Sequence, residues 1–224
     1  MGQPLAKRVV AEAVGTFFLL AAVVGSGIMA ERLANGNTAL ALLANTAATG
    51  TALVALIISF APLSGAHFNP VVTLAFALRH DLRWSDVPAY LLAQLAGGIA
   101  GVIAANLMFG LPMISLSQHS RAGMAQLFSE FIATFGLVSV ILAASRSTVV
   151  VVAVAVGAYI SAAYWFTAST SFANPAVTVA RSLSDTFAGI RPADVPGFVL
   201  AQLIGGIAAA ILFRWLMPSQ SRIY

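Results

Sequence analysis

The sequence predicts an all-α membrane protein with six transmembrane helices, two re-entrant half-helices and an inverted internal repeat. Three observations support this fold: an extreme apolar composition, uncharged intervals longer than one span, and an Asn-Pro motif that occurs twice. Charged residues are 8% of the 224 residues, hydrophobic residues are 60%, and the mean hydropathy is +0.94. Soluble domains carry about 25% charged residues, so this composition indicates an integral membrane protein.

The uncharged intervals give the positions of the spans. One transmembrane helix needs about 20 mainly apolar residues. Leu33–Leu78 and Ser147–Ala180 are each long enough for a full span followed by a shorter segment, whereas Met124–Ser145 holds one span interrupted only by Glu130. The expected spans are residues 9–30, 39–60, 87–109, 124–145, 148–166 and 195–217.

The two Asn-Pro steps predict the half-helices. Asn69-Pro70 and Asn174-Pro175 lie inside the two longest apolar intervals. Proline lacks a backbone donor and disfavours helix in the residue before it, while asparagine is a strong N-cap and proline suits the first helical turn. Each step therefore predicts a short helix that begins within the membrane, over about 69–79 and 174–183. The alternative, a simple kink in each span, is disfavoured because the steps occupy equivalent positions of a repeat.

Two further segments define that repeat. The segment 12–17 is similar to 130–135, and 87–99 is similar to 195–207. We expect a single domain made of two repeats, at about 1–110 and 120–224. Three spans per repeat is an odd number, so the second repeat is inverted in the membrane. The two half-helices then enter from opposite faces and meet by their N-termini at the midplane.

The Lys and Arg residues predict the orientation. With both termini in the cytoplasm, more of them fall on the cytoplasmic side than on the outer side, as the positive-inside rule requires. The basic start Lys7-Arg8 resembles a signal peptide, but Glu12 interrupts the apolar run that follows it. We therefore expect a multi-pass protein of the inner (cell) membrane with both termini cytoplasmic.

The place where the half-helices meet has the chemistry of a pore. Irregular backbone within a membrane persists only where it is buried in protein or lines a wet cavity. Two helix N-termini facing one point supply partial positive charge, and the amides of Asn69 and Asn174 add donors. Such a place orients water, interrupts a proton wire and repels cations, which favours the passage of neutral solutes.

Three further polar residues lie close to this place or inside the spans. Glu12 and Glu130 are intramembrane carboxylates and therefore need partners in the bundle interior. They could relay protons, but their symmetric placement favours accepting hydrogen bonds from the N–H groups of the re-entrant loops. His67 borders the pore in one interpretation and is a packed, neutral side chain in the other.

These motifs resemble the aquaporin family of major intrinsic proteins over essentially the whole chain. The twin Asn-Pro boxes, the Glu and Thr-Phe pairs and the run from Ser64 to Pro70 carry the resemblance. It implies six tilted helices and two half-helices per subunit, a pore through each subunit, and a homotetramer in the lipid bilayer. The midplane residues that it implies are Asn69, Pro70, Val71, Asn174, Pro175 and Ala176. Val71 departs from the alanine usual in the family.

In the family, four positions at fixed spacing from the two Asn residues form an outer constriction. They correspond here to Thr49, Ala162, Ser171 and Val177. Relatives specific for water usually carry an aromatic residue, a histidine and an arginine among the four, and glycerol conductors keep the arginine and add aromatics. This chain has no Arg, His or aromatic residue at those positions. Arg181, one turn beyond Val177, is a candidate to replace the missing guanidinium.

A ring without Arg or aromatic side chains is expected to be wide, weakly polar and weakly positive, and such properties set selectivity. The resemblance then implies a passive channel for small uncharged solutes. Its expected partners are water, polyols, urea and hydroxylated metalloids such as arsenite, antimonite, boric acid or methylated arsenicals. The alternative is a facilitator of mainly water or glycerol.

Other functional classes fit the sequence less well. The net charge of +4 and the pI near 10.1 are not accompanied by a basic stripe with interleaved aromatics, so no nucleic acid is expected. The absence of Cys excludes a thiolate metal site and a cysteine nucleophile, and neither a metal nor a cofactor is expected. The Asp residues fall in loops, so an intramembrane hydrolase is disfavoured and no enzyme is expected. A non-conducting receptor would not require two half-helices. An ion-coupled carrier would use intramembrane charges near the site, and only Glu12 and Glu130 are available, both interpreted as structural.

Overall fold

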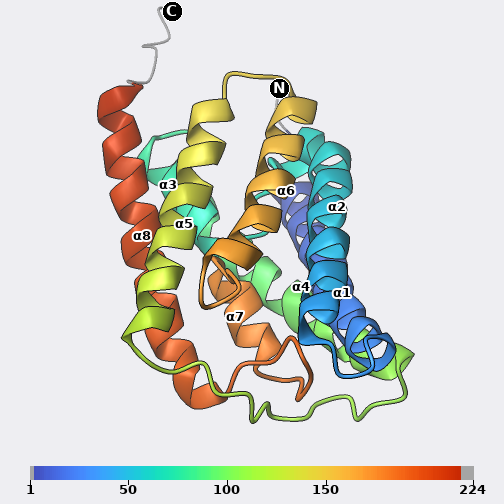
Figure 1. Cartoon of the computed structure of the whole chain (residues 1–224). Helices are drawn as coiled ribbons and strands as arrows, with labels where there is room; N and C mark the ends of the chain where they lie inside the picture. The colour runs from blue at the N-terminus through green and yellow to red at the C-terminus, as the bar shows by residue number, and fades with distance from the viewer. Residues whose placement is uncertain (1–2, 218–224) are drawn as a thin grey trace, which may run out of the picture.

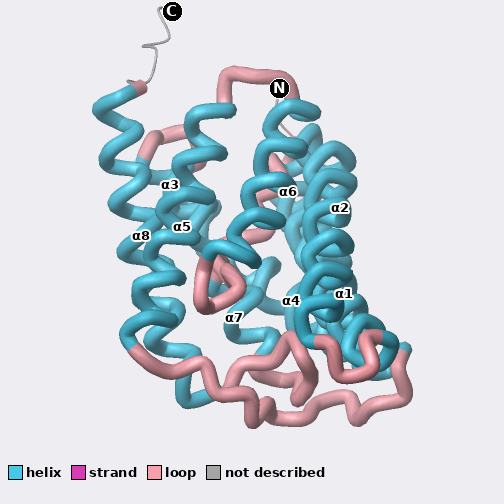
Figure 2. Tube along the Cα trace, viewed as in Figure 1, coloured by secondary structure: helices cyan, strands magenta, loops and turns pink. Residues whose placement is uncertain are grey.

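Eight α-helices and two 3-10 turns form the fold in the computed structural model, which describes residues 3–217 (Figures 1 and 2). Six of the helices are long and apolar enough to span a membrane. These six are α1 (Leu5–Leu33), α2 (Thr38–Ser64), α4 (Val87–Met108), α5 (Met124–Ala144), α6 (Val149–Phe166) and α8 (Val195–Leu216). The shorter elements are α3 (Pro70–Leu78), α7 (Pro175–Arg181) and the turns Trp84–Asp86 and Pro192–Asp194. The described residues contain no β-strand, as the sequence predicts. The outermost residues of the two predicted repeats, 1–2 and 218–224, lie outside this range.

The spans lie where the apolar intervals predict them, and the differences concern helix ends. α1 extends beyond the predicted 9–30 at both ends, and α2 continues past residue 60 to Ser64. Pro62 lies in the last turn of α2 and removes one intrahelical hydrogen bond without ending the helix. Gly65 ends it instead, because its φ of 93° forms a left-handed C-cap.

The long helices pack in the same order in the two halves. α1 packs against α2 and α4, and α5 packs against α6 and α8. Glycines allow the closest approaches: a Cβ on Gly97 would overlap the carbonyl of Ala13 in α1, and a Cβ on Gly205 would overlap the carbonyl of Phe131 in α5. α2 packs against α6 and so joins the halves.

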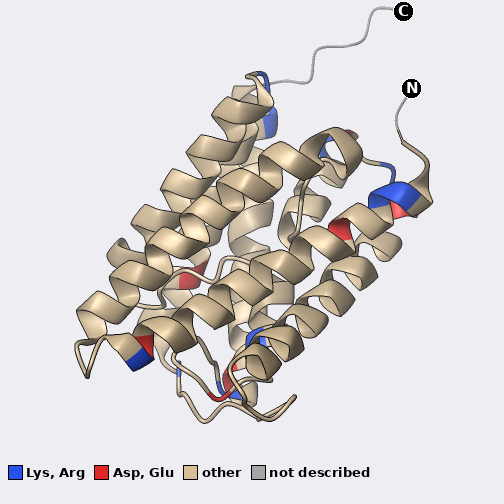
Figure 3. Ribbon diagram, turned by 90° about the vertical axis from the view of Figure 1, so that its right-hand side faces the viewer, with Lys and Arg blue, Asp and Glu red and all other residues tan. Residues whose placement is uncertain are grey.

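α3 and α7 lie within the bundle, among the long helices (Figure 1). Both contact α4 and α8, and they contact each other. The amino end of α1 and the carboxyl end of α8 lie at the same end of the molecule. Charged residues gather mostly near the two ends and leave long uncharged helix surfaces between them (Figure 3). The molecule is an all-α membrane protein with six spans and two half-helices.

Candidate functional site: a cavity between two Asn-Pro loops

The side chains of Asn69 and Asn174 join the two half-helices. Each Oδ1 caps its own helix by accepting a hydrogen bond from the N–H two residues further on, at 2.9 Å for Asn69 and 3.0 Å for Asn174. Each Nδ2 donates across the midline, Asn69 to the carbonyl of Ala173 and Asn174 to the carbonyl of Phe68, both at 2.8 Å. An amide nitrogen carries two hydrogens, so one hydrogen of each amide is left for another acceptor.

The loops before the two half-helices share the same pattern of positive φ values. Ala66 and Phe68 have φ values of 51° and 49°, and the equivalent Ser171 and Ala173 have values of 49° and 48°. Non-glycine residues in this left-handed region cost of order 1–3 kcal/mol each and persist only where the surroundings fix them. Two buried glutamates supply that fixation.

Glu12 holds the first loop. Its carboxylate accepts hydrogen bonds from the N–H groups of His67 at 2.9 Å and Phe68 at 2.7 Å. It also accepts from the hydroxyl of Ser64 at 2.6 Å and the amide of Gln94 at 2.8 Å. The side chain is fully buried. These four donors occupy the acceptor positions of both carboxylate oxygens and leave none free for a second proton carrier.

Glu130 makes the equivalent contacts in the second loop. It accepts hydrogen bonds from the N–H groups of Phe172 at 2.9 Å and Ala173 at 2.8 Å, and from the amide of Gln202 at 2.6 Å. Like Glu12, it is fully buried. Both carboxylates therefore make the contacts expected of residues that support the loops.

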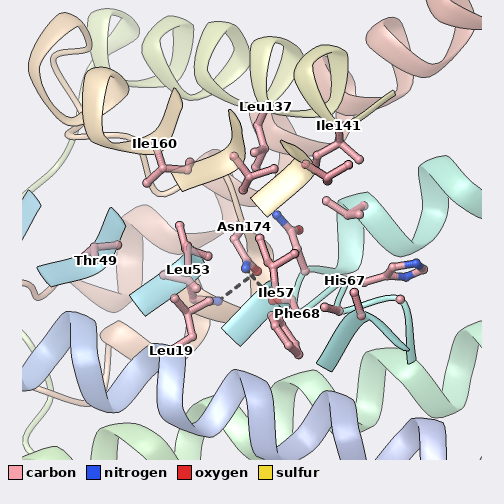
Figure 4. A pocket seen from close by; sticks show the side chains of 18 of the residues that line it. Leu19, Thr49, Leu53, Ile57, His67, Phe68, Leu137, Ile141, Ile160 and Asn174 are labelled. Carbon is pink, nitrogen blue, oxygen red and sulfur yellow. Dashed lines mark hydrogen bonds between the residues drawn. The ribbon is translucent and has the colours of Figure 1, made fainter. Parts of the chain in front are cut away.

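A cavity of about 240 Å³ passes between these loops and α2, α5 and α6. Asn69 and Asn174 line it, and Thr49 and His67 lie on opposite sides of Asn174 along it (Figure 4). The two ends are named here the Thr49 end and the His67 end. Much of the remaining wall is aliphatic, including Leu19, Leu53, Ile57, Leu137, Ile141 and Ile160 (Figure 4). Among residues 3–217, no group of three or more His, Cys, Asp and Glu side chains could hold a metal ion.

The other residues of the Asn-Pro boxes do not line this cavity. Pro70 and Pro175 form the first turns of α3 and α7. Val71 and Ala176 follow them and are almost completely buried, Val71 in a cluster with α5 and α8. Their place is therefore in the packing that positions the Asn side chains.

Three of the four constriction residues predicted from spacing line the cavity: Thr49, Ser171 and Val177. The fourth, Ala162, does not, because it lies on an exposed face of α6. Ile160 and Tyr164 line the cavity in its stead. Residues four apart share one face of a helix, whereas the residue between them faces the other side. The spacing from Asn174 crosses the irregular segment 167–174, which does not preserve the helical register.

Tyr164 and Arg181 bring to the Thr49 end the aromatic ring and the guanidinium that the spacing argument found missing. The Tyr164 hydroxyl donates to Thr49 Oγ1 at 3.3 Å. The Arg181 guanidinium is buried, donates from Nε to the carbonyl of Ala188, and lies over the ring of Phe172. Arg181 is the only Lys, Arg, Asp or Glu among the described residues that line the cavity.

His67 is both packed and part of the cavity wall. Its Nδ1 lies 3.1 Å from Thr73 Oγ1, and its ring stacks on Phe76 with centroids 4.7 Å apart. The Thr73 hydroxyl donates to the carbonyl of Asn69 at 3.1 Å, so the hydrogen between Nδ1 and Thr73 belongs to the imidazole. This assignment leaves Nε2 as the acceptor of the neutral ring.

Sequence reasoning missed four aromatic residues of the wall: Phe68, Phe76, Phe172 and Tyr164. Phe172 is the repeat equivalent of His67, and Phe76 is the equivalent of Arg181. An alignment of the two repeats could have found both. No comparable signal exists for Tyr164, since its position depends on how α6 is rotated about its axis.

Comparison with known proteins identifies the family. The family model described as Major intrinsic protein matches residues 3–148 and 144–223. The chain is 58% identical over 213 residues to the aquaglyceroporin AqpS of Rhizobium meliloti (strain 1021), covering 95% of this chain and 91% of the relative. It is 31% identical over 209 residues to aquaporin NIP1-4 of Oryza sativa subsp. japonica, covering 91% and 74%. The X-ray structure of the aquaglyceroporin from Plasmodium falciparum has the same fold, with a TM-score of 0.76, 19% identity, and coverage of 96% and 98%. The chain therefore belongs to the major intrinsic protein family.

Proposed function

We propose that this channel for small solutes such as water and glycerol works passively and also admits larger uncharged solutes. The observation that carries the proposal is the cavity, which both Asn side chains line and whose wall extends from Ser145 and Ser147, between α5 and α6, to Tyr164 and Arg181. Membership of a family of channels means that the protein is not an enzyme. Neither a metal nor a cofactor is needed for such passage.

Charge at the site supports neutral solutes as cargo. The N-termini of α3 and α7 and the guanidinium of Arg181 are positive, and no Asp or Glu of the described chain lines the cavity. Cations are repelled there. The long aliphatic wall offers ions no replacement for their hydration, which disfavours anions too. An uncharged solute can exchange water for the Asn amides and the hydroxyls of the wall.

The residues proposed as the selectivity filter are Thr49, Ser171 and Val177. Val177 presents an apolar side chain where relatives place an arginine. The smaller valine leaves the passage wider and offers the solute no hydrogen-bond donors. This supports passage of polyols and of hydroxylated metalloids, including arsenite, antimonite and methylated arsenicals. The similarity to an aquaglyceroporin supports the polyols in particular.

A second candidate is a facilitator of mainly water or glycerol. It is favoured by Tyr164 and Arg181, which narrow the Thr49 end and make it more polar than the four spacing positions alone indicate. The two candidates differ in the size of the largest solute that passes.

The roles of the supporting residues follow from their contacts. We propose that Asn69 and Asn174 meet the solute at the midplane, with Pro70, Val71, Pro175 and Ala176 positioning them. Glu12 and Glu130 hold the loops, and His67 borders the inner part of the pore.

We also propose the location and assembly of the channel. Two inverted repeats, about 1–110 and 120–224, form one channel domain, because equivalent glutamates, glutamines and asparagines make equivalent contacts in both halves. The protein resides in the inner membrane with both termini cytoplasmic, so the His67 end is the cytoplasmic end. Family resemblance supports a homotetramer.

Purified protein in proteoliposomes tests the solute range by stopped-flow light scattering. Permeabilities to water, glycerol and a five-carbon polyol are compared between the wild type and Val177→Arg, while arsenite uptake is measured directly. If the filter is wide, the wild type conducts the larger polyol and arsenite, and Val177→Arg lowers their flux far more than that of water. Equal ratios in the two proteins, or a wild type that excludes both larger solutes, would leave the water or glycerol facilitator.

A further inference from the structure

We propose that Tyr164 and Arg181 determine solute selection at the Thr49 end, in the places that the family pattern assigns to Ala162 and Val177. The proposal rests on the channel function above and names the groups that a solute meets there. Four polar side chains carry it: Tyr164, Arg181, Thr49 and Ser171. All four line the cavity and all are buried by their neighbours.

Tyr164 braces one wall of the cavity. Its ring is 3% exposed, and its hydroxyl donates to Thr49 Oγ1 at 3.3 Å. The bond connects α6 to α2, the two helices that join the halves of the protein at this wall. The phenol thus occupies a fixed position, and its bulk limits the width of the passage.

Thr49 keeps a hydrogen to offer. Its neighbours Thr46 and Thr51 donate their hydroxyl hydrogens to the carbonyls four residues earlier, both at 2.7 Å. Within residues 3–217, Thr49 makes no such bond and only accepts from Tyr164. A hydroxyl carries one hydrogen and two lone pairs, so Thr49 can donate to a solute while it accepts from the tyrosine.

Ser171 is an unsatisfied group in the same wall. Its Oγ is buried and has no hydrogen-bond partner among the described residues, although the residue is only 3% exposed. Leaving a buried hydroxyl without a partner costs free energy, so a partner is expected to occupy this place. The cavity that Ser171 lines is where water or a solute hydroxyl can supply it.

Arg181 presents the strongest donors. Its guanidinium carbon lies 3.4 Å from the centroid of the Phe172 ring, and Nε is taken by the carbonyl of Ala188. No described residue accepts a hydrogen bond from either terminal Nη group. Arg121 contacts the same ring at 4.9 Å, but its three nitrogens all donate to loop carbonyls or a hydroxyl. The guanidinium nitrogens of Arg121 therefore all donate to the loop, whereas the Nη groups of Arg181 remain able to donate to a solute.

These groups match a neutral solute with several hydroxyls. Arg181 donates, Thr49 and Ser171 can each donate or accept, and Val177 and Ile160 offer an apolar wall to the carbon skeleton. A polyol presents hydroxyls on one side and C–H groups on the other. The positive charge of Arg181 is held without a carboxylate partner within the described chain, so it also acts against cations.

The test compares three variants in proteoliposomes: Tyr164→Ala, Arg181→Lys and the control Ala162→Val. Water, glycerol and a five-carbon polyol are the probes. Tyr164→Ala removes the ring and should raise the ratio of polyol to water permeability by about fivefold or more. Arg181→Lys keeps the charge but loses the forked donors, and the ratio of glycerol to water permeability should fall by about fivefold, the factor that corresponds to one hydrogen bond. Ala162 faces away from the cavity, so Ala162→Val should change neither ratio.

Size-exclusion profiles and thermal stability establish that each variant is folded. If Tyr164→Ala does not fold, the comparison of the permeability ratios of Arg181→Lys with those of Ala162→Val still tests the proposal. The proposal is overturned when the folded Tyr164 and Arg181 variants leave both ratios at the wild-type value, whether or not Ala162→Val shifts them. The proposed function fails separately, when the wild-type protein itself conducts no more glycerol than empty liposomes.

Discussion

The guanidinium carbon of Arg181 lies 3.4 Å from the centroid of the Phe172 ring, close to the Thr49 end of the cavity. The same two repeat positions are occupied at the His67 end by Phe76 and His67, whose rings stack with centroids 4.7 Å apart. In each half, a residue of the loop before the half-helix contacts a residue at the far end of that half-helix. In the first half the polar residue lies in the loop and the phenylalanine in the half-helix, and in the second half this order is reversed. The Thr49 end of the cavity therefore has a cation and the His67 end a neutral imidazole.

Phe172→Leu should destabilise the protein because it removes the ring face beneath Arg181. A cation–π contact away from water contributes about 2 kcal/mol. For a chain of this length, each kcal/mol lowers Tm by about 2–4 °C. Thermal unfolding in detergent measures the effect. The matched control is Phe18→Leu, whose side chain is 51% exposed on α1. Equal Tm values for the two variants would contradict a stabilising role of the Arg181 contact.

Much of the fold could be predicted from local features of the sequence. The apolar intervals place six spans to within a few residues, because hydropathy and chain length alone decide what crosses a bilayer. Asn69 and Asn174 predict the half-helices, because an Asn-Pro step caps a helix through contacts within its own first turn. The burial of Glu12 and Glu130 beside hydrogen-bond donors could also be predicted, because a carboxylate without partners inside a membrane is costly.

The wall of the cavity could be predicted less completely. The spacing rule placed Ala162 at the Thr49 end, and the structure places Tyr164 there. The irregular segment 167–174 separates α6 from the Asn-Pro step, and the direction of a side chain after such a segment depends on tertiary packing. The position of Arg181 depends likewise on Phe172 and on the loop carbonyl of Ala188. Neither contact is encoded in the period of a helix.

Asn69→Asp should disrupt conduction while keeping the N-cap. The substitution replaces the Nδ2 donor, 2.8 Å from the carbonyl of Ala173, by a carboxylate oxygen that repels this carbonyl. The carboxylate also removes the second amide hydrogen, which is free to bind a solute, and loss of one such hydrogen bond at about 1–1.5 kcal/mol should lower glycerol flux by roughly tenfold. Asn174→Asp should behave alike, because Asn174 makes the equivalent bond to Phe68. Wild-type flux in both variants, at equal protein density in the liposomes, would refute a solute path past these amides.

Glu→Gln substitutions should reduce the yield of folded protein, and Glu12→Gln more than Glu130→Gln. An amide replaces one acceptor oxygen by a donor, and Glu12 accepts four hydrogen bonds where Glu130 accepts three. The alanine variants should be worse still, since they remove every acceptor. The monodisperse fraction in size-exclusion chromatography measures the yield. A Gln variant that folds like the wild type and loses only a pH-dependent transport step would favour a proton relay.

Cysteine substitution can map the cavity directly, because the natural chain contains no Cys. Wild-type conduction should persist in mercuric chloride, which needs a thiolate to bind. Ser171→Cys should make conduction sensitive to a small, membrane-impermeant thiol reagent, since Ser171 lines the cavity. Ala162→Cys should stay insensitive, because Ala162 lies on an exposed face of α6. Block of the Ala162 variant without block of the Ser171 variant would reverse the assignment of the wall.

We propose that neutral solutes cross the protein passively, through a path that ions do not share. Glycerol entry into proteoliposomes, measured by stopped-flow at increasing glycerol concentration together with bilayer conductance on the same preparation, tests it most directly. The structure predicts glycerol entry that rises linearly with the gradient, is independent of Na⁺ and H⁺ gradients, and is accompanied by no conductance above that of the bare bilayer. Entry that saturates at low concentration and collapses with an ion gradient, or a cation current through the wild-type protein, would contradict it.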